Sequence, residues 1–217
     1  MATQARSSTT PTPARSSTAS GNPKDPATLL AGLLSSKVRA AVLTWLVARQ
    51  DAAWSLTEIA RGVGMAISSV QHECYKLEGL DILTGTPVHG SRRYALNRAF
   101  PPTEPLMHLV YAAWGFPSLA AAALADLGDD LQEASLRYRG QSAQEATLVL
   151  IGDVSLDLLA TAQTRIALLL DLVPDALDVA FFQPAQWSAR VDDRDPLVAR
   201  LLDLPGVTLK APSPDQG

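Results

Sequence analysis

The chain has 217 residues, of which 47% are hydrophobic and 18% charged, so it is long enough for two small domains with packed cores. Its single cysteine, Cys74, excludes an intramolecular disulfide and a cysteine-based zinc site. The chain contains no run of about 18 apolar residues, and no apolar stretch follows Met1. We therefore expect a cytoplasmic protein with neither a membrane span nor a signal peptide.

The formal net charge of −4 is unevenly distributed. Residues 1–23 carry +2, residues 24–100 carry +3 and residues 101–217 carry −9. Such asymmetry favours a basic part that faces nucleic acid and an acidic part with another task. The basic excess is modest, so tight binding would need dimerisation or specific contacts.

Residues 1–23, rich in Ser, Thr and Pro, are predicted to be a disordered tail, as are residues 212–217. Ser35 or Ser36 is expected to cap a helix that runs to about Arg49. A short strand at residues 54–56 then leads to a helix with Thr57 as its N-cap. Glycines at 62 and 64 predict a tight turn.

A third helix is predicted from the region of Ser68 to Glu78, where Gly79 ends it. Its expected buried face, at helical spacing, comprises Ile67, Val70, Cys74 and Leu77. Residues 81–84 and 92–96 are predicted to be strands joined by a turn over residues 85–90.

Four segments of the predicted helices and wing occur in a fixed order. They are SLTEIARGVG at residues 55–64, SSVQ at 68–71, YKLEGL at 75–80 and the Arg-Arg-Tyr of the last strand. This pattern resembles winged helix-turn-helix transcriptional regulators of the ArsR and MarR type, over about a third of the chain. The resemblance implies a winged helix-turn-helix domain at residues 24–100 that binds double-stranded DNA. The alternative is a winged helix used as an antitoxin-like protein-interaction module.

In this resemblance, the helix near residues 66–78 enters the major groove, where base edges present a distinct pattern of donors and acceptors. The face of this helix opposite its expected buried side carries short polar and basic side chains. Tyr75 and Glu73 lie near that face. The wing adds residues suited to phosphate or the minor groove, and of its two adjacent arginines one is expected to contact DNA and the other to be structural. The predicted DNA-binding residues are Ser68, Ser69, Gln71, His72, Lys76, His89, Ser91, Arg92 and Arg93.

Residues 101–127 are predicted to be a helical linker. Thr103 or Glu104 is expected to cap a helix that runs to Trp114, and a second helix should follow from about Ser118 to Asp126. Such a linker helix commonly packs against its twin, which favours a homodimer. Burial against the protein's own domains is the alternative.

Residues 128–211 have an alternating strand and helix pattern. Strands are expected at about 133–139, 147–151, 176–182 and 207–209, with helices after Ser155 (to about Leu172), Pro184 and Pro196. The phrases LVLIGDVS at 148–155 and DVAFF at 178–182 resemble the minimal nucleotidyltransferase domain. The predicted fold class is therefore α+β: a winged helix-turn-helix, a helical linker and a small α/β nucleotidyltransferase-like domain.

That family uses a Gly-Ser pair and an Asp-x-Asp motif, with a third acid on a later strand, to hold Mg²⁺ and nucleotide phosphates. Here ASLRYRG at 134–140 lacks the Gly-Ser pair, Glu145 keeps one acid of the motif, and Thr147 replaces the other. Asp178 fits the third position. Asp153 and Asp157 are expected only to favour the dipole of the following helix.

The predicted function is therefore sequence-specific binding of double-stranded DNA by a transcriptional regulator in the cytoplasm, associated with the nucleoid. The C-terminal domain is expected to be a pseudoenzyme, without catalytic residues, cofactor or metal, that serves dimerisation, sensing of a small-molecule effector or binding of a protein partner. The alternative enzyme would be a nucleotidyltransferase that uses Glu145 and Asp178.

Overall fold

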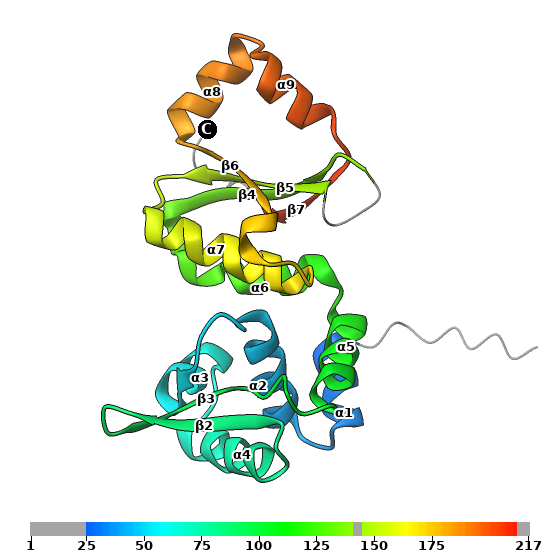
Figure 1. Cartoon of the computed structure of the whole chain (residues 1–217), viewed down its shortest axis with the longest axis vertical. Helices are drawn as coiled ribbons and strands as arrows, with labels where there is room; N and C mark the ends of the chain where they lie inside the picture. Colours follow the sequence, from blue (N-terminus) through cyan, green and yellow to red (C-terminus); the bar gives the residue numbers. More distant parts are fainter. Residues whose placement is uncertain (1–24, 141–144, 212–217) are drawn as a thin grey trace, which may run out of the picture.

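The computed structural model describes residues 25–140 and 145–211 of the chain. The predicted disordered tails, residues 1–23 and 212–217, lie outside the described residues. The described part is α+β, as predicted, with one small sheet in each half (Figure 1). No single helix within it is long and apolar enough to cross a membrane.

The N-terminal half runs through α1 (Pro26–Leu33), α2 (Lys37–Ala48), β1 (Trp54–Ser55), α3 (Leu56–Val63), α4 (Ile67–Gly79), β2 (Leu83–Val88) and β3 (Ser91–Leu96). This is the element order predicted for the winged helix-turn-helix, with α1 as an unpredicted addition. Asp25 caps α1, because its carboxylate accepts a hydrogen bond from the Thr28 N–H at 3.0 Å. Ser36 caps α2 as predicted and accepts from the Arg39 N–H at 3.1 Å.

The hairpin of β2 and β3 differs from the prediction. The wide turn predicted from Gly85 onward is wrong, because β2 continues to Val88 and only two residues separate the strands. These residues, His89 and Gly90, have φ values of 46° and 80°, and two positive φ angles match the twist of a tight hairpin. The first strand includes Pro87, which β2 accommodates because it lies at the edge of the sheet order β1-β3-β2.

Two helices and a 3₁₀ turn connect the halves: α5 (Thr103–Trp114), α6 (Phe116–Leu124) and η1 (Ala125–Asp130). The bounds of α5 are as predicted, but the predicted cap is wrong. Pro102 is the N-cap residue, and Thr103 is fully buried with a hydroxyl that has no hydrogen-bond partner among the described residues. Gly115, with φ of 72°, breaks the helix and lets α6 begin two residues before Ser118.

The C-terminal half contains β4 (Leu131–Tyr138), β5 (Ala146–Gly152), α7 (Leu156–Leu169), η3 (Pro174–Ala176), β6 (Asp178–Phe182), α8 (Pro184–Asp192), α9 (Pro196–Asp203) and β7 (Gly206–Lys210). The predicted strands and helices of this half are present, although α7 ends three residues earlier than expected. The sheet order is β6-β5-β4-β7, with β5 and β6 parallel and the other pairs antiparallel. Helices α6 and α7 cover one face, and α8 and α9 lie over the other (Figure 1).

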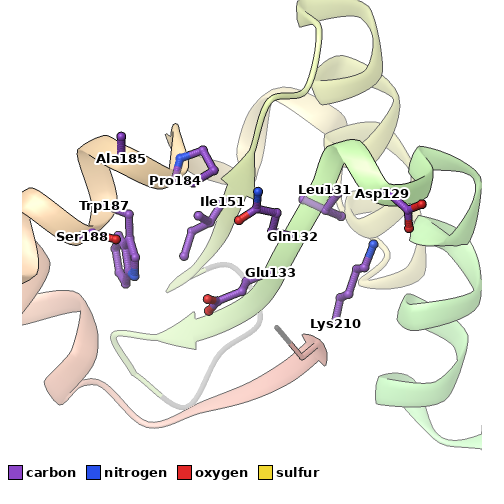
Figure 2. Close-up of a pocket in the computed structure, with 10 residues that line it drawn as sticks. All are labelled: Asp129, Leu131, Gln132, Glu133, Ile151, Pro184, Ala185, Trp187, Ser188 and Lys210. Atoms are coloured by element: carbon purple, nitrogen blue, oxygen red, sulfur yellow. The ribbon is translucent and has the colours of Figure 1, made fainter. Parts of the chain in front are cut away.

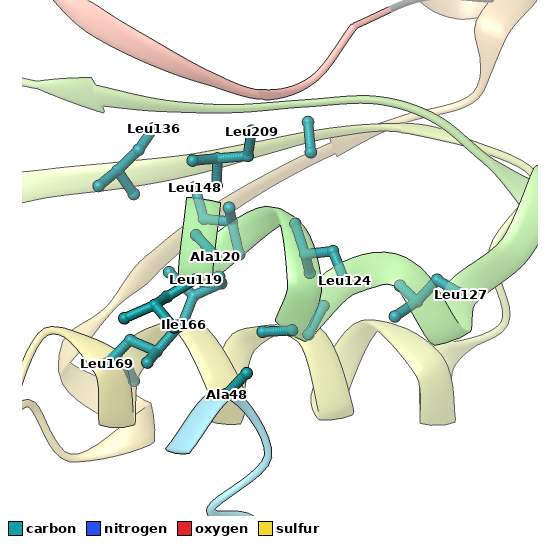
Figure 3. Packing of buried hydrophobic residues seen from close by; sticks show 14 of the residues in the cluster. Ala48, Leu119, Ala120, Leu124, Leu127, Leu136, Leu148, Ile166, Leu169 and Leu209 are labelled. Carbon is teal, nitrogen blue, oxygen red and sulfur yellow. The ribbon is translucent and has the colours of Figure 1, made fainter. Parts of the chain in front are cut away.

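The main buried cluster runs through both halves of the chain. Leu30 of α1 and Ala48 of α2 belong to the same cluster as Leu119 of α6 and Ile166 of α7. Figure 3 shows Ala48 reaching the layer formed by α6 and α7 below the sheet. This apolar core is continuous across the predicted boundaries between the domains. The division into residues 24–100, 101–127 and 128–211 stays a prediction.

Two buried arginines join the halves beside this core. Arg165 of α7 is 4% exposed and forms ion pairs with Asp51 and Asp126, each at 3.0 Å. Arg49, at the end of α2, is 5% exposed and pairs with Asp126 at 2.7 Å. The Arg165 guanidinium also donates to the carbonyl oxygen of Ala123 at 2.8 Å. The end of α2 and the residues after it are therefore tied by charge to η1 and to α7, beside the apolar packing.

Candidate nucleic-acid interface

Helix α3 is fixed at its start by a capping box. The Ser55 hydroxyl accepts from the Glu58 N–H at 3.3 Å, and the Glu58 carboxylate accepts from the Ser55 N–H at 2.8 Å. The predicted N-cap, Thr57, is wrong and lies inside the helix. The hydrogen bond from the Ser55 backbone, which outweighs the opposite effect of burial, lowers the pKa of Glu58. Gly64, with φ of 65°, ends α3 and turns the chain into α4.

Helix α4 rests on the domain core through one face. Val70, Cys74 and Leu77 are buried there, as their spacing predicts. Burial, with smaller contributions from the charges of Glu73 and Glu78, raises the pKa of the Cys74 thiol to about 12. Cys74 is therefore a small apolar core residue rather than a nucleophile or metal ligand.

Two residues of α4 lie on other faces than predicted. Ile67, at the first position of α4, was expected in the core but is 49% exposed and lies outside the hydrophobic cluster that buries Val70. Glu73, expected near the exposed face, is buried. Its carboxylate accepts from the Arg39 guanidinium at 2.9 Å and lies 3.6 Å from the Lys76 ammonium. These pairs stabilise a charge that would otherwise be costly to bury.

The five predicted DNA-binding residues of α4 lie away from the core. Gln71 is half-buried, and the amide nitrogen of its side chain donates to the Tyr75 hydroxyl at 2.9 Å. The remaining four are exposed: Ser68, Ser69, His72 and Lys76. Lys76 is also the partner of Glu73, so part of its charge is already neutralised. The arrangement presents hydroxyl, amide and imidazole groups on one helix, and their contact with DNA stays a prediction.

Both wing arginines are held by the protein itself. The Arg92 guanidinium binds the carboxylate of Glu78 at the end of α4. The Arg93 guanidinium donates to the carbonyl oxygen of Ala53 at 2.8 Å and lies 3.4 Å from the Glu58 carboxylate. Arg92 is exposed and Arg93 is half-buried, so Arg92 is the more accessible of the two. The expectation of one DNA-facing and one structural arginine therefore favours Arg93 as the structural residue.

The tip of the wing carries the other two predicted residues. His89 is exposed in the two-residue turn, and Ser91 is exposed at the start of β3. The Ser91 hydroxyl donates to the carbonyl oxygen of Val88 at 3.2 Å, which stabilises the turn. The fold thus places α4 and the hairpin next to each other, joined by the ion pair between Glu78 and Arg92.

Two further exposed cations belong to this region and are missing from the predicted set. Lys37 is the first residue of α2. The first turn of this helix lies beside α4, as the ion pair between Arg39 and Glu73 shows. Arg61 lies in the last turn of α3. Within residues 25–140 and 145–211, neither has an ion-pair partner. Arg61 could have been included from the sequence, because it lies within the helix-turn-helix motif. Lys37 could not, because nothing in the sequence shows that α2 begins beside α4.

The positions that resemble nucleotidyltransferase acids meet at one end of the C-terminal sheet. Thr147 and Asp178 are neighbours in the parallel pairing of β5 and β6, and the Arg139 N–H donates to the Glu145 carbonyl oxygen at 3.0 Å. The Arg139 guanidinium binds the Asp178 carboxylate. A cation at Asp178 would have to displace this arginine, and Thr147 offers only a hydroxyl. The donor set therefore does not fit the metal ions of that family.

A cavity of about 480 Å³ lies on the opposite side of this sheet from α6 and α7 (Figure 2). Glu133 of β4 and Trp187 of α8 line one part of it, and Lys210 of β7 lines another. The Lys210 ammonium donates to the carbonyl oxygen of Gly128 at 2.6 Å. Charges of both signs beside an aromatic wall suit a small polar molecule.

No protein-family model matches the chain. No curated protein matches it. Among solved structures, the crystal structure of Pseudomonas aeruginosa HmgR has 27% sequence identity and a TM-score of 0.27. The match covers 57% of this chain and 50% of that one, so the chain spans about half the length of HmgR. A TM-score of this size does not establish a common fold.

Proposed function

We propose that this protein binds double-stranded DNA and regulates transcription. One observation carries the proposal: α4 presents Ser68, Gln71 and His72 on a free face, directly beside a β-hairpin tipped by His89. An α-helix fits the major groove, and hydroxyl, amide and imidazole groups can donate to or accept from base edges there. The hairpin then lies where it can follow the backbone or the adjacent minor groove.

The unpaired cations supply the nonspecific part of the affinity. Lys37 and Arg61 are not neutralised within the described residues, so they are available to phosphates. Arg92 is available only if it leaves Glu78. Each phosphate contact releases counterions, which makes duplex binding weaken with salt.

A salt titration of duplex binding tests this proposal. The logarithm of the binding constant falls with the logarithm of the salt concentration, and removing one phosphate contact should make this slope less steep by about one. We expect this for Arg61→Ala but not for Arg200→Ala, an exposed arginine of α9 that also lacks an ion pair in the described residues. Failure of the folded wild type to bind duplex at low salt would reject the proposal and favour a protein partner for the winged helix.

The C-terminal half is proposed to be non-catalytic and to serve dimerisation, effector sensing or partner binding. The ion pair of Arg139 with Asp178 and the neutral Thr147 support this view. The cavity beside Glu133 and Trp187 is the site that we assign to a small polar effector. For the homodimer, α5 would have to use its exposed side, because Met107 and Val110 are already buried within the chain.

Nucleotide transfer is the decisive assay for this half. We expect no Mg²⁺-dependent transfer of labelled nucleotide to protein or RNA, and no change on replacing Asp178 by Asn. Transfer by the wild type that is lost in Asp178→Asn would show an active nucleotidyltransferase instead.

A further inference from the structure

An exposed strip of α4 combines an aliphatic side chain with an amide. Ile67, at the first position of the helix, is 49% exposed and lies outside the hydrophobic cluster beneath α4. Gln71 and Tyr75 follow at intervals of four residues, which places all three along one flank of the helix. Tyr75 is 50% exposed, and its hydroxyl accepts from the Gln71 amide at 2.9 Å. This hydrogen bond orders the Gln71 side chain on the same flank of the helix as Ile67, one helical turn away.

This pair of side chains matches the chemistry of one base pair. Thymine carries a methyl group on its major-groove edge, and an apolar side chain gains from contact with it. The adenine of the same pair offers N6 and N7, which a glutamine amide can bind. The residues at the start of a recognition helix are those that contact base edges. Ile67 cannot form a hydrogen bond with its side chain, so only an apolar group would be favourable beside it.

We propose that Ile67 is a specificity-determining residue that contacts the methyl group of a thymine, with Gln71 bound to the adenine edge beside it. This inference rests on the proposed DNA-binding function. It assigns at least one A·T pair to the bound DNA sequence, at the position that the first turn of α4 reaches.

The matched control residue is Leu80, which directly follows α4. It is 59% exposed and of the same size as Ile67, but it lies at the opposite end of the helix. The thirteen helical steps from Ile67 to Leu80 correspond to about 20 Å, so Leu80 cannot contact the same base pair. Both residues are exposed, and replacing either by Ala should leave the fold intact. Circular dichroism of both variants checks this.

The experiment replaces single thymines by uracil in duplexes selected by the full-length protein from a random library. Uracil keeps the base pairing and lacks only the methyl group. At one position, we expect the substitution to weaken binding by the wild type and by Leu80→Ala about fourfold, the ratio for one buried methyl group. Binding by Ile67→Ala should be indifferent to the same substitution.

The outcomes separate this inference from the proposed function. The protein could bind duplex tightly and yet lose no affinity when any single thymine is replaced by uracil. That result would overturn the inference and leave the proposed function standing. An equal uracil effect in Ile67→Ala would also overturn it, because another residue would then contact the methyl group. If no duplex is selected or bound at low salt, both the inference and the proposed function are rejected.

Discussion

Gly62 of α3 lies against the indole ring of Trp45 in α2. A Cβ atom at this position would overlap the indole nitrogen, and that ring is fixed by the edge of Trp54 at 5.1 Å and by Arg49 at 4.6 Å. Gly62 is therefore required by close helix packing rather than by an unusual backbone angle. Gly79, the last residue of α4, has no atom within 4 Å of such a Cβ.

These two glycines should respond in opposite directions to substitution. In an open helical position, Gly→Ala adds about 0.5–1 kcal/mol to the free energy of unfolding. We expect a gain of this kind for Gly79→Ala. For Gly62→Ala, overpacking against Trp45 should cost about 1–3 kcal/mol and reverse the sign. Urea unfolding of both variants measures the difference, and stabilisation by Gly62→Ala would contradict the packing described.

Helical spacing predicted the buried residues of α4 well and its exposed residues less well. Val70, Cys74 and Leu77 are in the core as expected, because their period is a local property of the sequence. Ile67 fits the same period, yet it is 49% exposed although Val70 in the same turn is buried. Glu73 is buried because Arg39, 34 residues earlier, neutralises it. Coverage and pairing of this kind depend on tertiary contacts that spacing does not contain.

The elements themselves were predictable where caps and breakers are strong. Ser36 and Ser155 cap α2 and α7 as expected. The hairpin was misplaced because the prediction assigned the whole of residues 85–90 to a turn, whereas β2 continues through Pro87 at the edge of the sheet. The predicted N-cap of α3, Thr57, is also wrong, because Ser55 forms the capping box with Glu58 two residues earlier.

The cap of α3 can be tested by comparing these two residues. Ser55→Ala removes one half of the capping box and should lower the free energy of unfolding by about 1 kcal/mol. Thr57→Ala should change it by less than about 0.5 kcal/mol, because Thr57 is exposed and does not cap the helix. Thermal and urea unfolding give both values. Equal effects of the two substitutions would mean that the helix does not begin at Leu56.

At the scale of the whole molecule, the sequence predicted which residues of α4 and the wing lie away from the core, but not their ion pairs. The exposed residues of α4 and the wing lie where the resemblance placed them. The partners of Arg92 and Arg93, and the cations Lys37 and Arg61, depend on how the elements pack. The junction of the two halves was not predicted, because Asp51 and Arg165 are 114 residues apart in the sequence.

Asp126 is the shared carboxylate of that junction. Burial raises its pKa, but hydrogen bonds and charge from Arg49, together with those from Arg165, outweigh burial and lower the pKa below its usual value. A carboxyl group with a lowered pKa in the folded state stabilises the fold at pH values above its unfolded pKa, about 3.9. This contribution is lost as the pH falls through the lowered, folded-state pKa.

Asp126→Asn leaves two nearly buried guanidinium groups with fewer partners and should lower the free energy of unfolding at neutral pH. Loss of one partner from a fully buried pair costs about 3–5 kcal/mol, and the 44% exposure of the Asp126 side chain reduces this to roughly 2 kcal/mol. The difference from the wild type should shrink as acid protonates Asp126, because a neutral aspartic acid then resembles the asparagine.

Asp171→Asn is the control, since Asp171 is 91% exposed in its 3.6 Å pair with Arg98 and should contribute less than about 1 kcal/mol. Urea unfolding as a function of pH measures both; a difference that persists unchanged into acid would show that Asp126 acts through packing and not through its charge.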